Sequence, residues 1–142
     1  MERILVGLDP GKTSLWAAIH ALNLAKRIKA KVFILMVEGD MQREERTRIE
    51  ERIQSSVKAD LEALIETERS EGIAVEYYVA HGPYDQELIR FIKKNKITLL
   101  VLGLPSWRKK GSSGKIMGLV EKIRRRVDCR IEVVHEKRLR SQ

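Results

Sequence analysis

Glycines, serines and cations gather in one segment of the chain, VLGLPSWRKKGSSGKIMG, which covers residues 101–118. Backbone N–H groups left open by glycine, next to the positive end of a helix dipole, can bind phosphate. The residues that offer such groups directly before a helical pattern are Gly111, Ser112, Ser113, Gly114 and Lys115. The P-loop pattern GxxxxGK[ST] is broken, because Lys109 and Ile116 occupy two of its required positions. The segment therefore predicts either a phosphate site of another kind or a basic loop without a ligand.

Asp9 is the second residue suited to ligand chemistry, because it is an acid directly after the apolar run 4–8. A carboxylate at the end of a first parallel strand can accept hydrogen bonds from a ribose or a base. It can equally accept them from the backbone of the turn that it opens. Open parallel sheets bind ligands beyond the carboxyl ends of their strands, so we expect Asp9, Val37 and Gly103 to lie close together.

Apolar periodicity predicts strands and helices in strict alternation along the whole chain. We expect five strands, at 4–8, 32–37, 74–80, 97–103 and 130–135. We also expect four helices. The first is capped by Thr13 or Ser14, and the others lie at 42–71, at 84–95, and from Ile116 to Val127. Right-handed crossovers turn this order into a Rossmann-like three-layer α/β/α sandwich around a mainly parallel five-stranded sheet. The last strand, Arg130 to His135, alternates polar and apolar residues, which predicts an edge strand able to pair with a partner.

The totals describe one soluble domain of 142 residues, which we place at 1–136 with a basic C-terminal tail at 137–142. The net charge of +8 comes entirely from the last 40 residues, which hold 12 Lys and Arg against 4 Asp and Glu. No apolar run approaches the roughly 20 residues of a membrane helix. The chain enters a strand at once, which predicts no signal peptide, and the single cysteine, Cys129, fits a cytoplasmic protein.

The sequence commits to no catalytic group and to no metal site. The three histidines, His20, His81 and His135, fall on separate elements without metal-ligand spacing. No histidine-bearing element offers a serine or cysteine nucleophile beside it. We therefore expect a protein that is not an enzyme, with slow hydrolysis of a bound nucleotide left open.

Several weak patterns in the order found here resemble the universal stress protein (UspA-like) family. They are GLD after the first strand, the AxxLAKRxxA helix, the apolar second strand ending in Val37, the turn HGP, ITLLVLG, and VDC before the last strand. The resemblance covers nearly all of residues 2–135. It implies an adenine nucleotide alpha hydrolase-like fold and a homodimer that pairs through the last strand. It also implies ATP binding in some members and none in others.

The nucleotide-binding members of that family carry G-x2-G-x9-G-[S/T] from the end of the fourth strand. Here the pattern is G-x2-S-x11-G-L, with Gly103, Ser106, Gly118 and Leu119 at the four named positions. A side chain at Ser106 hinders close approach to phosphate, and Leu119 donates no hydrogen bond. The resemblance implies that Asp9 and Val37 hold the nucleoside of ATP or AMP. Gly103, Ser106, the 111–115 loop and Gly118 would take the phosphates.

Two other functions remain open. The same fold can act without nucleotide as a dimeric interaction module through Arg130 to His135. The basic end of the chain, with Arg124, Arg125 and Arg126, can also bind nucleic acid, an acidic protein or an anionic surface. A solvated helix face explains these arginines equally well. Trp107 can stack on a base or pack against the neighbouring helix.

Overall fold

The computed structural model describes residues 1–9, 15–38, 48–104 and 112–135, and it forms a single sheet covered by helices. The strands are β1 (Glu2–Leu8), β2 (Ala30–Glu38), β3 (Val75–His81), β4 (Leu99–Leu104) and β5 (Arg130–His135). The helices are α1 (Trp16–Ile28), α2 (Arg48–Ser70), α3 (Tyr84–Asn95) and α4 (Ser112–Arg124). None of the described helices is long and apolar enough to cross a membrane.

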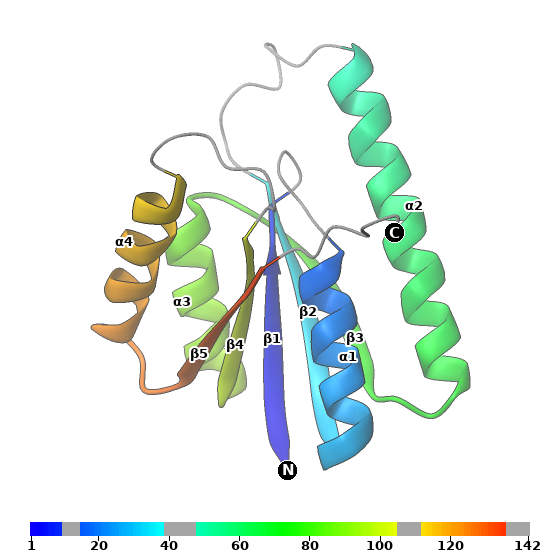
Figure 1. The fold of residues 1–142 in the computed structure, drawn as a ribbon, viewed down its shortest axis with the longest axis horizontal. Coiled ribbons are helices and arrows are strands. Elements are labelled where there is room, and N and C mark those ends of the chain that lie inside the picture. The colour runs from blue at the N-terminus through cyan, green and yellow to red at the C-terminus, as the bar shows by residue number, and fades with distance from the viewer. Residues whose placement is uncertain (10–14, 39–47, 105–111, 136–142) are drawn as a thin grey trace, which may run out of the picture.

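The sheet has five strands in the order β3-β2-β1-β4-β5, and every neighbouring pair is parallel. All strands therefore end at one edge, drawn at the top of Figure 1. The chain builds the sheet outward from β1 in one direction and then from β4 in the other. The strand order thus reverses between β1 and β4, where open α/β sheets bind their ligands. The predicted fold class is confirmed, and the sheet is entirely rather than mainly parallel.

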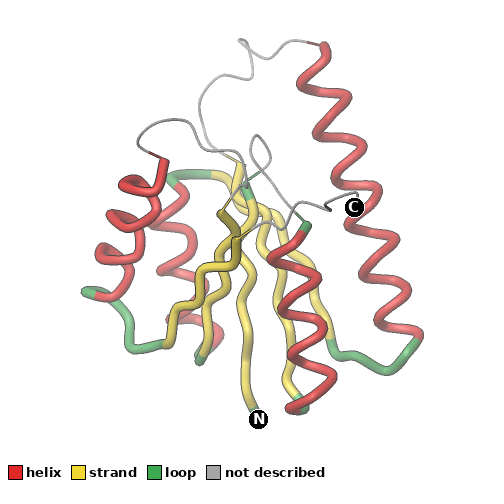
Figure 2. The backbone as a smooth tube through the Cα atoms, viewed as in Figure 1, coloured by secondary structure: helices red, strands yellow, loops and turns green. Residues whose placement is uncertain are grey.

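Helices cover both faces of the sheet, as Figure 2 shows. On one face α1 and α2 bury apolar side chains such as Ala21 and Leu61 against the strands. On the other face α3 and α4 do the same with side chains such as Leu88 and Ile123. The four side chains are each fully buried. Two apolar layers on a parallel sheet give the three-layer sandwich that the sequence predicts.

Several boundaries differ from the predicted ones. β4 begins at Leu99 instead of residue 97, because Lys96 takes a left-handed conformation with φ of 53° that ends α3. The Ile97 N–H then bonds the carbonyl of Ile92 at 3.1 Å and stays outside the strand ladder. The described part of α2 begins at Arg48, and predicted helical residues 42–47 lie outside the described residues.

The N-cap of α1 is Leu15, whose side chain makes no capping hydrogen bond. The predicted cap residues, Thr13 and Ser14, lie outside the described residues, so their capping role stays a prediction. The bounds of α3 and β5 agree with the predicted 84–95 and 130–135. β5 also stands at the edge of the sheet, as its alternating pattern predicts.

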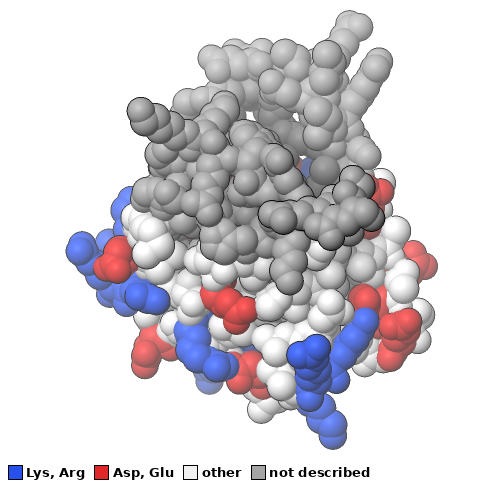
Figure 3. Space-filling model, in the orientation of Figure 1, with Lys and Arg blue, Asp and Glu red and all other residues white. Residues whose placement is uncertain are grey.

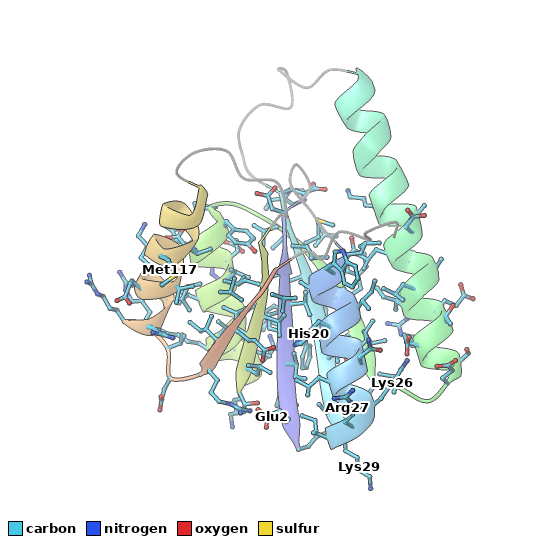
Figure 4. The ribbon with its side chains drawn as sticks, viewed as in Figure 1. Glu2, His20, Lys26, Arg27, Lys29 and Met117 are labelled. Carbon is cyan, nitrogen blue, oxygen red and sulfur yellow. The ribbon has the colours of Figure 1, made fainter. Side chains whose placement is uncertain are left out.

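Polar side chains join three strands at the amino edge of the sheet, near Glu2 in Figure 4. The Thr98 hydroxyl donates to Glu2 Oε1 at 2.7 Å, and Arg130 Nη2 donates to the same oxygen at 2.5 Å. Thr98 Oγ1 also accepts the Arg3 N–H at 3.0 Å. These hydrogen bonds, from Thr98 first and Arg130 second, lower the pKa of Glu2. Thr98 thereby links the start of β1 to the segment that enters β4, while Arg130 links β1 to β5.

β1 passes unusually close to α3 at Gly7. A Cβ on Gly7 would lie 2.7 Å from Leu88 Cδ2 and 2.9 Å from the Tyr84 hydroxyl oxygen. Leu88 is fully buried and cannot move aside without disturbing the layer between the sheet and α3. The glycine in the GLD pattern therefore serves the packing of α3 against the sheet.

Gly7→Ala should lower the free energy of unfolding by about 2 kcal/mol, because added methyl groups in a packed core typically cost about 1–3 kcal/mol. Gly118→Ala is the matched control, because nothing lies within 4 Å of a Cβ at Gly118 in α4. Alanine there should raise the free energy of unfolding by up to about 1 kcal/mol, since it favours helix over glycine. Urea unfolding measures both changes. Equal stability of Gly7→Ala and the wild type would contradict this account of the packing.

Candidate functional site

The strand register brings three predicted site residues to the same edge of the sheet. The β1–β2 ladder ends with Leu8 opposite Met36, so Asp9 and Val37 follow at the next step of the same register. On the other side of β1, Gly7 pairs with Leu102, which places Gly103 one step further along β4. Asp9, Val37 and Gly103 thus stand at the ends of three adjacent strands, around the point where the strand order reverses.

Val37 and Asp9 can offer different groups to a ligand. The Val37 side chain is only 3% exposed and belongs to the apolar layer beneath α3. Its contribution to a ligand can come only from its backbone, which lies beyond the last pair of the β1–β2 ladder. Asp9 is exposed, so its carboxylate is accessible from this edge.

Gly103 has a structural explanation of its own. It pairs with Val134 of β5, and a Cβ on it would lie 3.3 Å from the Ala17 Cβ in α1. The glycine lets α1 pack closely on the end of β4. Its predicted contact with phosphate stays a prediction, because the packing alone accounts for the residue.

The amino end of α4 opens at the same edge of the sheet, as Figure 1 shows. The first helical residues are 112–115, and the first four N–H groups of a helix have no acceptor within it. The backbone of the predicted Ser112, Ser113, Gly114 and Lys115 is therefore suited to an anion. The roles of their side chains stay predictions, and Ser106 and Gly111 lie outside the described residues.

Gly118 occupies a different position from these residues. It stands six residues after Ser112, in the second turn of α4, where a backbone N–H normally bonds a carbonyl of the preceding turn. Leu119, which breaks the hydroxyl position of the glycine motif, packs against the buried layer beneath α3 and α4. The structure therefore brings residues 112–115 to the strand ends and leaves Gly118 on an exposed side of the helix.

Tyr84 lies beneath this edge and was missed by the sequence analysis as a site residue. It is the first residue of α3, and its hydroxyl is the group that a Cβ on Gly7 would meet at 2.9 Å. Burial raises the pKa of Tyr84 far above its ordinary value, and the negative charge of Asp9 adds to that rise. A neutral hydroxyl therefore sits near the predicted nucleoside-binding acid. No sequence pattern reveals this, because the contact depends on how α3 crosses β1.

A nearly buried acid follows Val37 at the end of β2. Glu38 is 8% exposed, and its Oε1 accepts a hydrogen bond from Lys58 Nζ of α2 at 2.5 Å. Its Oε2 lies 3.5 Å from His81 Nδ1 at the end of β3, and its carbonyl accepts the Gly82 N–H at 3.0 Å. This cluster ties α2 and the β3–α3 turn to the end of β2. The sequence shows an acid after an apolar run but cannot identify its partner twenty residues later.

A groove of about 650 Å³ lies beside the amino-terminal part of β5, at the other end of the strands from the candidate site. Its lining residues are Leu24, Ile28, Leu99, Arg124, Cys129, Arg130, Ile131 and Glu132. Beside the groove, His20 of α1 pairs with Glu132 of β5, and Figure 4 shows His20 between these elements. The groove is lined by both apolar and charged side chains, and residues of β5, the strand predicted to pair with a partner, form part of it.

The arginines at the end of α4 are accessible. Arg124, Arg125 and Arg126 are all exposed, but so are the acids Glu121 and Asp128 next to them. In the space-filling view, basic side chains over α4 alternate with acidic ones (Figure 3). The mixture of both signs favours a solvated face over a continuous cationic surface among the described residues.

Comparisons with known proteins give one family and one fold. A family model described as the universal stress protein family matches residues 1–135. No match was found among curated proteins. A solved structure of a universal stress protein family member from Burkholderia pseudomallei is 18% identical, with a TM-score of 0.64, and the match covers 94% of this chain and 95% of that one.

Two further similar structures contain a nucleotide. A universal stress protein in complex with cAMP is 21% identical, with a TM-score of 0.64, and the match covers 94% of this chain and 96% of that one. A family protein from Arabidopsis thaliana with AMP bound is 11% identical, with a TM-score of 0.58 and coverage of 96% and 93%. At these identities the likeness concerns the fold.

Lys58→Met should lower the free energy of unfolding by about 2 kcal/mol, because a nearly buried carboxylate loses a charged donor. Adding Glu38→Gln should recover part of that loss, since the uncompensated charge is then removed. Lys122→Met is the surface control: Lys122 Nζ lies 3.3 Å from Asp85 Oδ2, the Lys122 side chain is 68% exposed, and this ion pair should contribute less than about 1 kcal/mol. Urea unfolding of the wild type, Lys58→Met, Glu38→Gln, the double variant and the Lys122→Met control measures the coupling. Additive effects of the two cluster substitutions would contradict the proposed pairing.

Proposed function

Because the chain belongs to the universal stress protein family, we propose that it is a regulatory protein that binds an adenine nucleotide. The ligand lies beyond the ends of β1, β2 and β4. The observation that carries this proposal is the register that gathers Asp9, Val37 and Gly103 at one edge, with the amino end of α4 opening beside them. Similar structures crystallised with cAMP and with AMP support the same ligand class.

Each part of the edge suits one part of an adenine nucleotide. The Asp9 carboxylate accepts hydrogen bonds from ribose hydroxyls, and the backbone of Val37 forms hydrogen bonds with the base. The backbone N–H groups at 112–115 bind phosphate, as helix amino ends do. Ser106 and Gly111 complete the phosphate site in this proposal. Gly103 keeps α1 close and Gly118 has no necessary role, so the broken glycine pattern does not remove the site.

We assign the protein a binding role rather than a catalytic one. The groups at this edge are a carboxylate, backbone amides and a neutral phenol, and no activated nucleophile stands among the described residues there. Such a site holds a nucleotide and couples its presence to the protein's conformation or partners. Slow hydrolysis of the bound nucleotide stays compatible with this role.

A second proposal concerns assembly: two copies pair through β5. β5 is an edge strand, and a row of unpaired backbone groups on such a strand is a template for a further strand. The groove beside it includes Ile28, whose apolar side chain is 44% exposed. A second copy that extends the sheet at β5 would cover both features. Dimerisation and nucleotide binding are compatible, because the groove lies away from the ends of β1 and β2.

The nucleotide proposal predicts that ATP or AMP at millimolar concentration raises the melting temperature, because a ligand that binds only the folded state stabilises it. Asp9→Asn should abolish most of the shift, whereas Asp128→Asn, an equal change of charge on an exposed acid elsewhere, should leave it intact. Tripolyphosphate is the ligand control and should give a much smaller shift. Differential scanning fluorimetry measures all of these. No shift with either nucleotide would remove the proposed function.

The assembly proposal predicts a dimer at micromolar protein in sedimentation equilibrium. Ile28→Glu should weaken it at least tenfold, because a charge would be buried at the edge of the interface. Met117→Glu is the matched control, since Met117 is 54% exposed on α4, away from β5. A wild-type protein that stays monomeric at high micromolar concentration would contradict pairing through β5.

A further inference from the structure

We propose that the ion pair between His20 and Glu132 makes pairing through β5 pH-dependent, so that two copies associate more tightly when His20 is protonated. This inference rests on the proposed assembly through β5 and concerns its regulation. His20 belongs to α1 and Glu132 to β5, and His20 Nε2 contacts Glu132 Oε1. The two side chains are 39% and 43% exposed, so both are accessible in one copy and can be covered by a second.

Glu132 lies on the face of β5 that α1 covers. Leu99, which belongs to the buried layer beneath α1, pairs with Arg130 in the β4–β5 ladder. Side chains two positions apart in a strand point to the same face, so Glu132 shares this face with Arg130 and Val134. Val134 packs against the same buried layer, which agrees with this assignment. Glu132 also lines the groove beside β5, so a strand added there would lie next to its carboxylate.

Two-fold symmetry brings the Glu132 side chains of two copies together. When two identical edge strands pair antiparallel, the two-fold axis is perpendicular to the sheet, and opposite residues point to the same face. An axis centred on Glu132 pairs residues 130–134 with each other and sets the two Glu132 side chains opposite, with Cβ atoms about 5 Å apart. An axis centred on Val133 pairs residues 131–135, and the two Glu132 side chains are then diagonal neighbours about 7–8 Å apart.

Like charges at these positions oppose association. In one copy water solvates part of each Glu132 carboxylate, whereas a second copy removes water and adds a second negative charge. A protonated His20 beside each Glu132 balances that charge, and a neutral His20 leaves two carboxylates close together at the interface. Histidine is the side chain that changes its charge between about pH 5 and pH 8. A fall in pH across this range should therefore strengthen the association.

The arginines near the pair do not replace His20 in this role. Arg130 lies on the same face of β5, but its Nη2 already donates to Glu2 Oε1 at 2.5 Å. Arg124, at the end of α4, also lines the groove. Arginine keeps its charge at every pH in this range, so neither side chain can make the association depend on pH.

The remaining groups that face the pair do not change charge in this range either. Cys129 lines the groove, and burial raises the pKa of its thiol, so the thiol stays neutral. β4 presents apolar side chains such as Val101 to α1. Among the described side chains that line this side of β5, His20 is therefore the one beside Glu132 whose charge responds to pH.

Sedimentation equilibrium of the full chain at about pH 8 and about pH 6 measures the effect. The dissociation constant of the wild-type dimer should be about tenfold lower at the lower pH, the size expected from one cross-strand charge contact per copy. Glu132→Gln keeps the shape of the side chain and removes the like charges, so its dissociation constant should be low at both pH values. His20→Gln should keep the high dissociation constant at both.

Two further histidine variants are the controls. His81 is exposed at the end of β3, on the opposite edge of the sheet, and His81→Gln should keep the wild-type pH dependence. His135 is the last residue of β5, and His135→Gln should keep it as well. A pH dependence that persists in His20→Gln, or that is lost in His135→Gln, would overturn the proposal.

Proton uptake gives a second readout that does not depend on the absolute affinity. A dimer favoured by protonation takes up protons when it forms and releases them when it dissociates. Dilution calorimetry at about pH 7, in buffers with different ionisation enthalpies, measures this release. The wild type should release protons on dissociation, whereas Glu132→Gln should release none.

The outcomes separate this inference from the assembly proposal. A dimer with the same dissociation constant at both pH values would end the regulatory role of His20 and leave pairing through β5 intact. A wild-type protein that stays monomeric at both pH values would end both proposals. Nucleotide binding at the ends of β1 and β2 is independent of either result.

Discussion

The parallel pairing of β1 with both β2 and β4 is the constraint on which the rest of this protein depends. β1 is buried on both faces and its ladder partners are fixed by register. A slip of one residue on either side would turn every side chain of the slipped strand to the opposite layer. Because register is fixed in this way, the strand ends are fixed too, and the acid after β1 stands beside the end of β2. The candidate site is a consequence of how the core packs.

Two glycines near that edge illustrate the same dependence. Gly7 admits Tyr84 and Leu88 from α3, and Gly103 admits Ala17 from α1, on the opposite face of the sheet. Both are needed for close packing whether or not a nucleotide binds. A glycine motif in this fold is therefore ambiguous, because part of it is required by the helices. The nucleotide proposal therefore depends most on the residues that packing does not explain, namely Asp9 and the first turn of α4.

The fold class could be predicted from the sequence because each strand and helix carries a strong local pattern of apolar residues. Continuous apolar runs predicted β1 and β2, and helical spacing predicted α3 with its observed bounds. The adjacency of Asp9 and Val37 also followed, since parallel strands end together. The contact of Tyr84 with β1 and the pairing of Glu38 with Lys58 did not follow, because both depend on how a helix crosses the sheet. The last helix was predicted from Ile116 to Val127, whereas α4 runs from Ser112 to Arg124; its start was missed because residues 112–115 carry no apolar periodicity, and the ligand role of Gly118 stays a prediction.

The most direct measurement of the central claim is the change in backbone amide NMR resonances when AMP is added to 15N-labelled protein. The account predicts that the perturbed amides cluster at the ends of β1 and β2, around Gly103, and in residues 112–115. Amides in the β5 groove, such as those of Cys129 and Ile131, should stay in place. Perturbation centred on that groove, or none at any residue, would contradict a nucleotide site at the ends of these strands.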